Sequence, residues 1–318
     1  MLAQQATTDG GGAIAARAVG IRPALECPVA PTCDASVLIC TRNRAASLRT
    51  TLDSLTALRI PDGTAWEVVV ADNGSTDDTA AVIEGFADRL PIRRLAEPRP
   101  GLSRARNAAL RAARGAVLLF TDDDCRVAPD WLATALQLLA DQPLQLLGGR
   151  IELFDPDALP LAVRSTPDRA VLASYSDIIG FLHGANLAFR RGLTDAIGAF
   201  DERLGAGSPT KSAEDADLVY RALRAGIPVV YEPALFVRHD HGRKGRATWY
   251  SQVGDHAQGF GGMLIKYLVK GDLRPARVAY WDFMSTLHMV RRDRREWPRV
   301  LAKLRTLNGV ITYFVRPL

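Results

Sequence analysis

The stretch that decides the fold reads Ala116-Val117-Leu118-Leu119-Phe120-Thr121-Asp122-Asp123-Asp124. Its first six residues are apolar or β-branched, and a run of this length between turn signals predicts a buried strand. Three carboxylates follow at the carboxyl end of the strand, which is where open α/β sheets bind ligands. Carboxylates this close repel one another unless a cation neutralises them, and Mg²⁺ and Mn²⁺ prefer such oxygen ligands. The stretch therefore indicates either a metal–phosphate site or a solvated acidic turn.

Strand-like and helix-like segments alternate before this stretch. Short apolar runs predict strands at 37–40, 68–71 and 92–95, and helical spacing follows each of them, at 48–55, 80–86 and 101–114. This order predicts a mainly parallel sheet with helices on its faces, an α/β fold. The later half is less regular, with a helix at 131–139, strands at 146–154, 187–189, 229–231 and 235–237, a loop or lid at 155–180, and a helix at 215–224. From Thr248 onward the pattern is helical.

Composition narrows the class of protein. The chain of 318 residues is 47% hydrophobic and 24% charged, which is typical of one large globular domain or two ordinary ones. Its cysteines show no C-x-x-C spacing, so we expect a reducing cytoplasm. Residues 1–34 lack the order of a signal peptide and are rich in Ala, Gly, Thr and Pro, which predicts a disordered leader. No apolar run approaches the roughly 18–20 residues of a transmembrane helix.

Positive charge is concentrated at the carboxyl end. From Asp240 to Leu318 there are 15 Lys and Arg residues against 6 Asp and Glu residues, whereas the whole chain carries a net charge of +5. A basic region suggests an anionic neighbour, which could be a substrate phosphate, a membrane surface or a nucleic acid. A solvated helical face explains the same charge equally well.

Polar segments follow the predicted strands. The first is Thr41-Arg42-Asn43-Arg44, the second runs from Asp72 to Thr79, and the third is the basic helix start Arg99–Asn107, which suits an anion or a base edge. Helix capping and the Asn73-Gly74 turn explain most of the second segment. They do not explain Asp72, whose carboxylate could accept a hydrogen bond from a nucleobase.

In these segments the chain resembles glycosyltransferase family 2, whose members are inverting, nucleotide-sugar-dependent enzymes with the GT-A fold. The resemblance covers about residues 35–240 and rests on four segments in the family's order: 36–44, 70–75, 101–107 and 120–124. It implies a GT-A catalytic domain at 35–240, with a nucleotide-binding half at 35–125 and an acceptor half at 126–240. A helical extension at 241–318 would follow.

The resemblance also implies roles on the donor side. Thr41 and Asp72 would hold the nucleobase with Arg106 beside them, and Arg44 would contact the nucleotide sugar. The triplet would be the D-x-D motif, with Asp124 as the principal ligand of Mg²⁺ or Mn²⁺ and with Asp122 and Asp123 near the ribose and diphosphate. His239 resembles a late histidine that completes the metal site in some members.

Further roles concern the acceptor side. The segment 184–191, with Gly184 and Asn186, resembles the family's acceptor-side segment, and Glu214-Asp215 matches its E-D motif, in which the Asp is the catalytic base. Each assignment has a plainer alternative. Acids favour a helix amino terminus through the dipole. His239 and His241 point to one face of a strand and fit a pair of surface histidines as well, and Arg243 and Lys244 could grip the diphosphate or simply be solvated.

The chemistry agrees with these roles. Transfer from a nucleoside diphosphate sugar needs the charge of the leaving group neutralised, which a bound metal does as a Lewis acid. It also needs an acceptor hydroxyl deprotonated, which a carboxylate supplies. Acids on opposite sides of the sugar permit in-line displacement with inversion.

Other classes of protein remain as alternatives. A sugar nucleotidyltransferase would carry a Gly-rich loop after the first strand, where this chain has Thr41–Arg44. A glycoside hydrolase needs two carboxylates but no base-binding strand ends. A catalytically silent scaffold subunit would not need the acids.

We therefore expect a metal-dependent hexosyltransferase that uses a nucleotide sugar, foremost a UDP-sugar, in bacterial cell-surface or polysaccharide biosynthesis. The acceptor would be a glycan, a lipid-linked glycan or a small molecule, and we expect no nucleic-acid partner. The enzyme would be cytoplasmic. Its carboxyl-terminal region would bind an anionic membrane surface as a peripheral anchor, or it would pack on the catalytic domain as a cap or form an oligomer contact.

Overall fold

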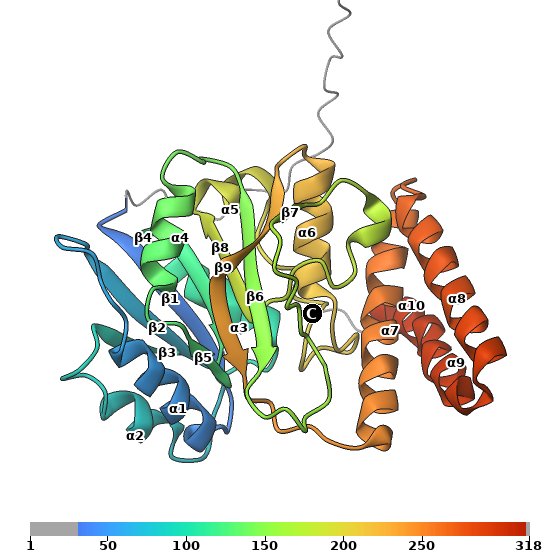
Figure 1. The fold of residues 1–318 in the computed structure, drawn as a ribbon, viewed down its shortest axis with the longest axis horizontal. Helices are drawn as coiled ribbons and strands as arrows, with labels where there is room; N and C mark the ends of the chain where they lie inside the picture. Colours follow the sequence, from blue (N-terminus) through green and yellow to red (C-terminus); the bar gives the residue numbers. More distant parts are fainter. Residues whose placement is uncertain (1–30, 316–318) are drawn as a thin grey trace, which may run out of the picture.

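Apolar strands form a mixed sheet at the centre of the molecule. The structure, a computed structural model, describes residues 31–315, and in this range the strand order is β3-β2-β1-β4-β8-β6-β9-β5, with β7 paired to β9 (Figure 1). The strands are β1 (Cys33–Thr41), β2 (Trp66–Asp72), β3 (Ile92–Ala96), β4 (Gly115–Asp122), β5 (Cys125–Val127), β6 (Leu146–Leu153), β7 (Ala170–Val171), β8 (Asn186–Arg190) and β9 (Val229–His239). The predicted α/β class is confirmed.

The first four strands of the order are parallel, which aligns their carboxyl ends. Thr41 at the end of β1 pairs with Asp72 of β2, and Cys40 pairs with Asp122 of β4. The loops that follow β1, β2 and β4 therefore leave the sheet at one edge. This register brings the segments that begin at Thr41 and Asp72 and the acidic triplet to the same edge of the sheet.

The remaining strands bring later residues to the same edge. Strand β8 is antiparallel to β4, and β6 pairs with β8 and β9. The two short strands predicted at 229–231 and 235–237 form one strand, β9, with an irregularity in its pairing to β6 between Gly149 and Arg150. Strand β5 runs antiparallel to β9, so that Cys125 lies opposite His239. His239 thus reaches the end of the acidic stretch.

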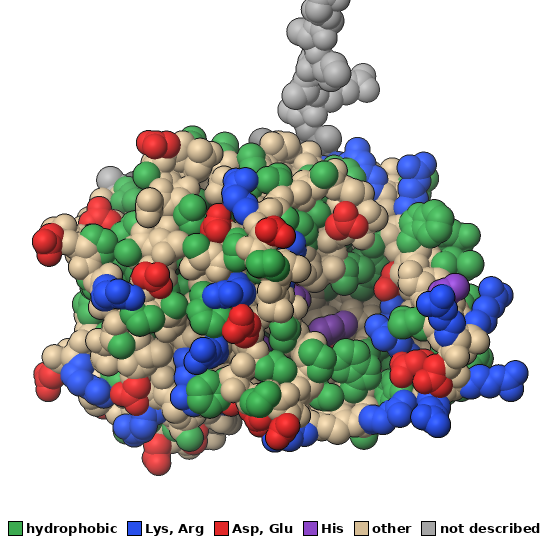
Figure 2. Space-filling view, in the orientation of Figure 1, with side chains coloured by type: hydrophobic (Ala, Val, Ile, Leu, Met, Phe, Trp, Pro, Cys, Tyr) green, Lys and Arg blue, Asp and Glu red, His purple; other side chains and the backbone are tan. Residues whose placement is uncertain are grey.

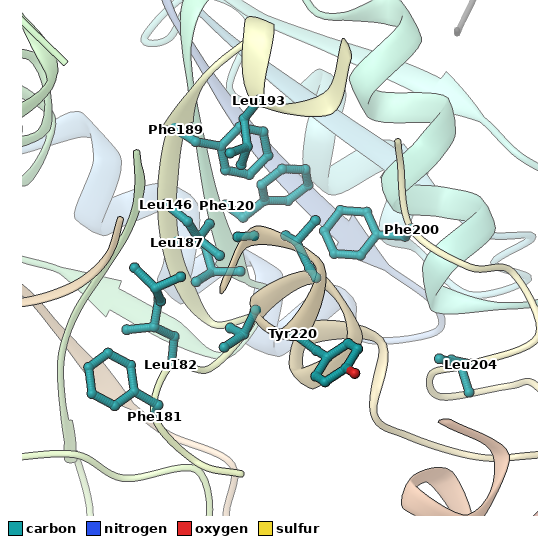
Figure 3. Close-up of a cluster of buried hydrophobic side chains, with 14 of the residues drawn as sticks. Phe120, Leu146, Phe181, Leu182, Leu187, Phe189, Leu193, Phe200, Leu204 and Tyr220 are labelled. Carbon is teal, nitrogen blue, oxygen red and sulfur yellow. The ribbon is translucent and has the colours of Figure 1, made fainter. Parts of the chain in front are cut away.

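Helices cover both faces of the sheet because strand residues alternate between the faces. Val117 and Leu119 of β4 pack in the cluster with α1, α2 and α4, whereas Leu118 and Phe120 pack with α3 and α6. Figure 3 shows Phe120 in the second cluster, where its ring centroid lies 5.9 Å from that of Phe189. The helices before the extension are α1 (Ala45–Thr56), α2 (Thr79–Glu84), α3 (Leu102–Ala112), α4 (Trp131–Leu139), α5 (Gly192–Ile197) and α6 (Glu214–Arg224), with a 3₁₀ turn at Tyr175–Asp177.

The helical extension shares the core of the sheet domain. It consists of α7 (Arg246–Leu268), α8 (Arg274–Arg292), a 3₁₀ turn (Arg294–Glu296), α9 (Trp297–Lys303) and α10 (Arg305–Val315). Phe260, Met263 and Tyr267 of α7 belong to the same buried cluster as Phe120. A Cβ on Gly259 would lie 2.1 Å from Ser212 Oγ. Only glycine at this position lets α7 pack so closely against the segment before α6. The predicted helical region is confirmed, and α7 packs on the sheet domain as the cap alternative requires.

Three short elements, β5, β7 and α5, did not emerge from the sequence pattern. The predicted leader, residues 1–34, overlaps β1 at Cys33 and Asp34, since Cys33 pairs with Gly115; its first 30 residues lie outside the described range. Within residues 31–315, no helix has the length and apolar character needed to span a bilayer.

Candidate active site

A cavity of about 560 Å³ lies where the carboxyl ends of β1 and β4 face the amino terminus of α6 and one side of α7. Figure 2 shows the hollow near the centre of the molecule, with histidine side chains in it. Most of the residues predicted from the sequence line this cavity: Thr41, Arg44, Arg106, Asp122, Asp123, Asp124, Gly184, Glu214, Asp215 and His239. The fold therefore joins the two acidic motifs, which are about 90 residues apart in the sequence, in one space.

Arg44 neutralises the acidic triplet. Its Nε lies 3.1 Å from Asp123 Oδ1 and its terminal nitrogen 2.7 Å from Asp124 Oδ2, and Thr41 Oγ1 donates a hydrogen bond of 2.7 Å to Asp123 Oδ2. Burial and the neighbouring acids Asp122 and Asp124 raise the pKa of Asp123 to about 7, against the opposing effect of Arg44 and Thr41. The cluster thus holds more negative charge than one arginine balances, which favours binding of a further cation.

Asp124 and His239 form a candidate metal site. Asp124 Oδ1 lies 3.1 Å from His239 Nε2, and together with the Cys125 thiol they form a buried group whose ligand atoms lie within 4.8 Å of one another. Burial disfavours the Asp124 carboxylate, but the hydrogen bond and charge of His239, with Arg44, lower its pKa to about 2. Burial raises the pKa of Cys125, so its thiol stays protonated and is a poor ligand. A carboxylate and an imidazole fit Mn²⁺ or Mg²⁺ with water and phosphate oxygens completing the shell.

Arg106 connects the donor and acceptor sides of the cavity. Its buried guanidinium lies 2.8 Å from Glu214 Oε1 and 3.4 Å from Asp122 Oδ1. A Cβ on Gly184 would lie 2.3 Å from an Arg106 nitrogen, so the glycine makes room for the guanidinium. Burial, and then the charge of Asp215, raise the pKa of Glu214 to about 7, and Arg106 opposes them. The predicted place of Arg106 was beside the nucleobase, whereas the structure places it between the two acidic motifs.

Asp215 presents its carboxylate from the first turn of α6. Its Oδ2 accepts a hydrogen bond of 3.1 Å from the Gly184 N–H, and its Oδ1 accepts one of 2.7 Å from the Ala216 N–H. The side chain is partly exposed to the cavity, unlike that of Glu214. Ala213 precedes the pair in a left-handed conformation, φ 76°, which non-glycine residues adopt at a cost. Strained backbone of this kind often accompanies a functional site.

Two further histidines lie in the cavity and were not predicted. His183 comes from the loop before β8, and His256 comes from α7 together with Gln252 and Phe260. Burial lowers the pKa of both histidines, and the charge of Asp215 opposes this in each. Both imidazoles therefore face Asp215 in the neutral form. His183 directly precedes the predicted Gly184, which was a usable signal, but no local pattern marks His256.

Asp72 and Asn186 are not among the residues that line the cavity. The Asp72 carboxylate binds Arg94 through both Nε (2.9 Å) and a terminal nitrogen (2.6 Å) and also accepts the Ser75 N–H. Its neighbour Asn73 lines the cavity instead. With its oxygens bonded to Arg94 and Ser75, Asp72 is not placed for the predicted nucleobase contact.

Asn186 is fully buried beneath the site. Its Oδ1 accepts a hydrogen bond from Trp131 Nε1 (2.9 Å), and its Nδ2 donates to the carbonyls of Leu235 (2.8 Å) and Arg150 (3.1 Å). The side chain thus joins α4, β6 and β9. These contacts indicate a structural role rather than the predicted contact with an acceptor.

The polar residues at the end of β9 and just after it differ in whether they line the cavity. The rings of His239 and His241 are 4.9 Å apart, but His241 binds the Leu159 carbonyl (3.0 Å) and accepts the Arg243 N–H (2.9 Å). Arg243 lines the cavity. Lys244 pairs with Asp155 at the surface, 2.8 Å away. Arg243 is therefore placed to reach a diphosphate, and Lys244 is not.

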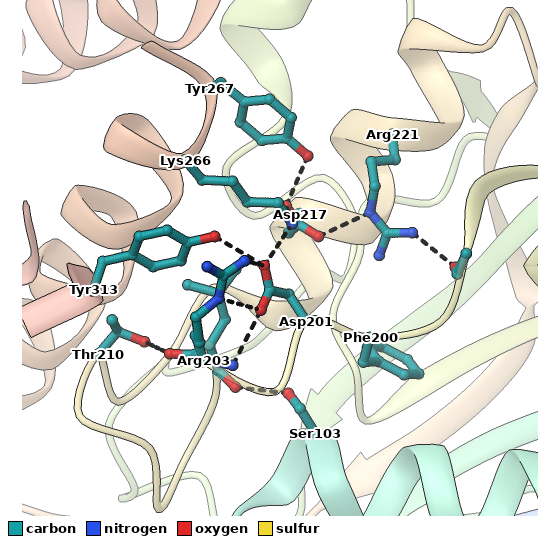
Figure 4. A network of polar contacts seen from close by, with 12 residues as sticks. Ser103, Phe200, Asp201, Arg203, Thr210, Asp217, Arg221, Lys266, Tyr267 and Tyr313 are labelled. Carbon is teal, nitrogen blue, oxygen red and sulfur yellow. Dashed lines mark hydrogen bonds and ion pairs between the residues drawn. The ribbon is translucent and has the colours of Figure 1, made fainter. Parts of the chain in front are cut away.

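A buried ionic network fixes α6 to the extension, as Figure 4 shows. Lys266 Nζ of α7 lies 2.6 Å from Asp217 Oδ1 and 2.9 Å from Asp201 Oδ2. The Tyr267 hydroxyl donates to Asp217 (2.7 Å), and the Tyr313 hydroxyl donates to Asp201 (3.1 Å). Since Asp217 lies two residues after Asp215, the helical extension holds the helix that carries the candidate base.

Comparisons with known proteins show which family this chain is similar to. The family model described as Glycosyl transferase family 2 matches residues 36–198. Glycosyltransferase AglE of Haloferax volcanii is 30% identical over 189 residues, which are 57% of this chain and 61% of AglE. The chain thus spans about three fifths of this relative.

Solved structures with low sequence identity share the fold. The mannosyltransferase PcManGT from Pyrobaculum calidifontis, in complex with GDP-Man and Mn²⁺, is 18% identical with a TM-score of 0.59, covering 91% of this chain and 90% of that one. Residues 1–349 of S. aureus TarS, in complex with UDP-GlcNAc, are 20% identical with a TM-score of 0.53, covering 74% and 71%.

Proposed function

This chain belongs to glycosyltransferase family 2 and has the GT-A fold, and we propose that it transfers a glycosyl group with inversion from a nucleotide-diphosphate sugar to a hydroxyl acceptor. One observation carries the proposal. The acids Asp123 and Asp124 of the triplet and the partly exposed Asp215 line the same cavity but come from separate elements, the end of β4 and the start of α6. In-line displacement needs this separation of charge neutralisation from deprotonation.

The donor diphosphate would bind at the acidic triplet. Asp124 and His239 would hold Mg²⁺ or Mn²⁺, which would supply Lewis-acid neutralisation of the leaving diphosphate. Arg44 pairs with Asp123 and Asp124, and its exposed fraction of 37% leaves it able to turn towards phosphate oxygens. Arg243 faces the same space from beyond β9. Thr41, Asp122 and Asp123 would then orient the donor, with the base and ribose along the β1 loop.

Asp215 would be the catalytic base. Two backbone N–H groups fix the position of its carboxylate, and lone pairs remain for an acceptor hydroxyl. Glu214 is buried against Arg106 and is less accessible to a substrate. We assign a supporting role to Glu214 and Arg106. The Arg106 guanidinium lies between the carboxylates of Glu214 and Asp122 and offsets their negative charge.

The acceptor would bind between Gly184 and α7. His183, His256 and Gln252 offer hydrogen bonds to hydroxyl groups, and Phe260 offers an apolar face. This mixture suits a sugar ring or another polyhydroxyl molecule. The acceptor class would be a glycan, a lipid-linked glycan or a small metabolite, and the setting would be cytoplasmic synthesis of bacterial surface polysaccharide.

The donor is tested first by thermal unfolding with UDP-, GDP- and dTDP-sugars in the presence of Mn²⁺. A ligand at 100 times its dissociation constant stabilises the folded protein by about 2.7 kcal/mol. We expect the largest shift with a UDP-sugar, and loss of that shift in Asp124→Ala. A larger shift with GDP-mannose would replace UDP with GDP and leave the reaction class intact.

The reaction is tested by donor turnover and by the anomeric configuration of the product. An inverting transferase yields the opposite anomer, seen by NMR, and slow hydrolysis of the donor without acceptor. A protein that binds no nucleotide sugar and hydrolyses none would instead be a silent scaffold subunit. Conversion of the nucleotide sugar and added pyrophosphate into a nucleoside triphosphate and a sugar 1-phosphate would point to a sugar nucleotidyltransferase.

A further inference from the structure

The end of the chain presents a row of apolar side chains to solvent. Each is more than half exposed: Trp297, Leu301, Leu304, Leu307, Ile311 and Phe314. Leu301 follows Trp297 by four residues along α9, Leu307, Ile311 and Phe314 share one face of α10, and Leu304 lies in the turn between the two helices. The opposite face is buried through Val300 and Tyr313. Continuous exposed apolar surface of this kind marks an interaction site.

Helix α8, which packs against α9, also has an exposed face. The exposed residues of this face recur every three or four positions, beginning at the helix start: Leu273, Arg277, Trp281, Met284, His288 and Arg291. Trp281 is 62% exposed and neighbouring Tyr280 is 56% exposed. Aromatic side chains with a polar edge are the type that concentrates at membrane–water interfaces.

Four arginines surround the turn between α8 and α9. Arg291, Arg292, Arg294 and Arg295 are all exposed, and Figure 2 shows basic side chains gathered at this corner, at the lower right. Arg291 and Arg294 line a surface hollow together with Trp297.

Within residues 31–315, none of these four guanidinium groups forms an ion pair. The acids nearby have other partners: Asp293 accepts the Arg295 backbone N–H, Glu296 pairs with Arg246, and Asp282 pairs with Lys303. The arginine charge is thus available to an external anion.

We propose that the outer faces of α8, α9 and α10, with the four arginines, dock on an anionic lipid bilayer. An apolar row with cations beside it matches acyl chains below anionic headgroups. A second copy of the chain fits less well, because a two-fold interface sets a patch against itself and would bring the uncompensated arginines together. An anionic surface, in contrast, gains attraction from each of them. This inference does not depend on the proposed reaction.

Vesicle co-sedimentation of the full chain tests the docking. We expect binding to phosphatidylcholine vesicles that contain about 30 mol% phosphatidylglycerol, weak binding to phosphatidylcholine alone, and release as NaCl rises towards about 500 mM. Arg291→Gln/Arg294→Gln should lower the partition coefficient about 30-fold, since each cation near the surface contributes on the order of fivefold. The matched control is Arg49→Gln/Arg59→Gln, which removes two exposed charges from the sheet domain and should bind as the wild type does.

The apolar row is tested with Leu307→Asp/Ile311→Asp. Both side chains are exposed, so the fold should survive, which the thermal midpoint checks, and vesicle binding should be lost. Equal binding by the control and the Arg291/Arg294 variant would overturn the proposal, as would a wild type that ignores anionic vesicles. A wild-type dimer in light scattering that Leu307→Asp/Ile311→Asp converts to monomers, without vesicle binding, would assign the surface to a second copy instead.

Discussion

Lys266 should be one of the most important stabilising residues outside the sheet. Its ammonium group lies between the carboxylates of Asp217 (2.6 Å) and Asp201 (2.9 Å), and all three side chains are at most 9% exposed. Lys266→Met keeps the length of the side chain but leaves both acids without this cation. Removing one partner of a buried ion pair costs about 3–5 kcal/mol, because the remaining charge is buried and uncompensated.

The structure places the expected cost near the lower end of that range. Asp201 keeps Arg203 at 3.0 Å, and Asp217 keeps Arg221 at 2.8 Å, so neither acid is left without a cation. We therefore expect Lys266→Met to lower the free energy of unfolding by about 3 kcal/mol. At about 2–4 °C per kcal/mol for a chain of this size, the thermal midpoint should fall by roughly 6–12 °C.

Urea and thermal unfolding measure this cost, and Lys244→Met is the matched control. Lys244 also forms a lysine–aspartate pair, at 2.8 Å, but its side chain is 54% exposed, so its loss should cost less than about 1 kcal/mol. Equal effects of Lys266→Met and Lys244→Met would refute the reasoning.

The contribution of the Lys266–Asp217 pair to the free energy of unfolding should depend on pH. Burial opposes the charged form of Asp217, but Lys266 and Arg221 lower its pKa below the ordinary value. A lowered carboxyl pKa stabilises the fold above the unfolded pKa, which is about 3.9, and the stabilisation is lost as the pH falls through the folded pKa. The difference in stability between wild type and Lys266→Met should therefore be full at pH 7 and should shrink below about pH 4.

Three further predictions concern the site. Asp215→Asn should retain donor binding in thermal-shift assays while glycosyl transfer falls by at least about 100-fold, and a near-native rate would move the base to another residue, Glu214 first. Asn186→Ala should lower the free energy of unfolding by about 2–4 kcal/mol, since it leaves buried hydrogen-bonding partners unsatisfied. The affinity for the donor, measured at low temperature, should not change. If the variant is fully stable and loses affinity only for the acceptor, the acceptor role predicted from the sequence would be restored. For Glu214, whose pKa is raised to about 7, the folded state holds the proton more tightly than the unfolded state, so wild-type stability should fall between about pH 4.5 and 7. Glu214→Gln should make that fall smaller but not abolish it, because the pKa of Asp123 is also raised to about 7; parallel urea-unfolding stability curves for the two proteins across this range would contradict the reasoning.

The sequence predicted the sheet half of the protein well because its strands carry strong local signals. The run before Asp122 and the apolar runs at 37–40 and 68–71 each became a buried strand in parallel register. Elements with few residues gave no such signal: β5 has three residues and β7 has two. Their pairing depends on β9, which is distant in the sequence, so periodicity could not reveal them.

The predicted site residues also differ in whether local sequence or tertiary packing decides their position. Those that project from strand ends or helix starts, such as Asp124 and Asp215, line the cavity because the register of the sheet places them there. Asp72 and Asn186 sit in matching motif positions, yet Arg94 and Trp131 occupy their polar atoms. Such partners are set by tertiary packing, and no motif spacing encodes them.

His256 shows what the sequence could not supply, and it changes how the extension is understood. By pattern alone, residues 241–318 were a basic helical region with two alternatives, a cap on the domain or a membrane anchor. The structure gives α7 one side that lines the cavity through His256 and Gln252 and another that packs against α9 and α10. Lys266 of the same helix pairs with Asp217 of α6, so α7 packs both against the outer helices and against the helix that carries Asp215. The two alternatives are therefore compatible: α7 is the cap, and the outer helices are free to serve as the contact with an anionic surface.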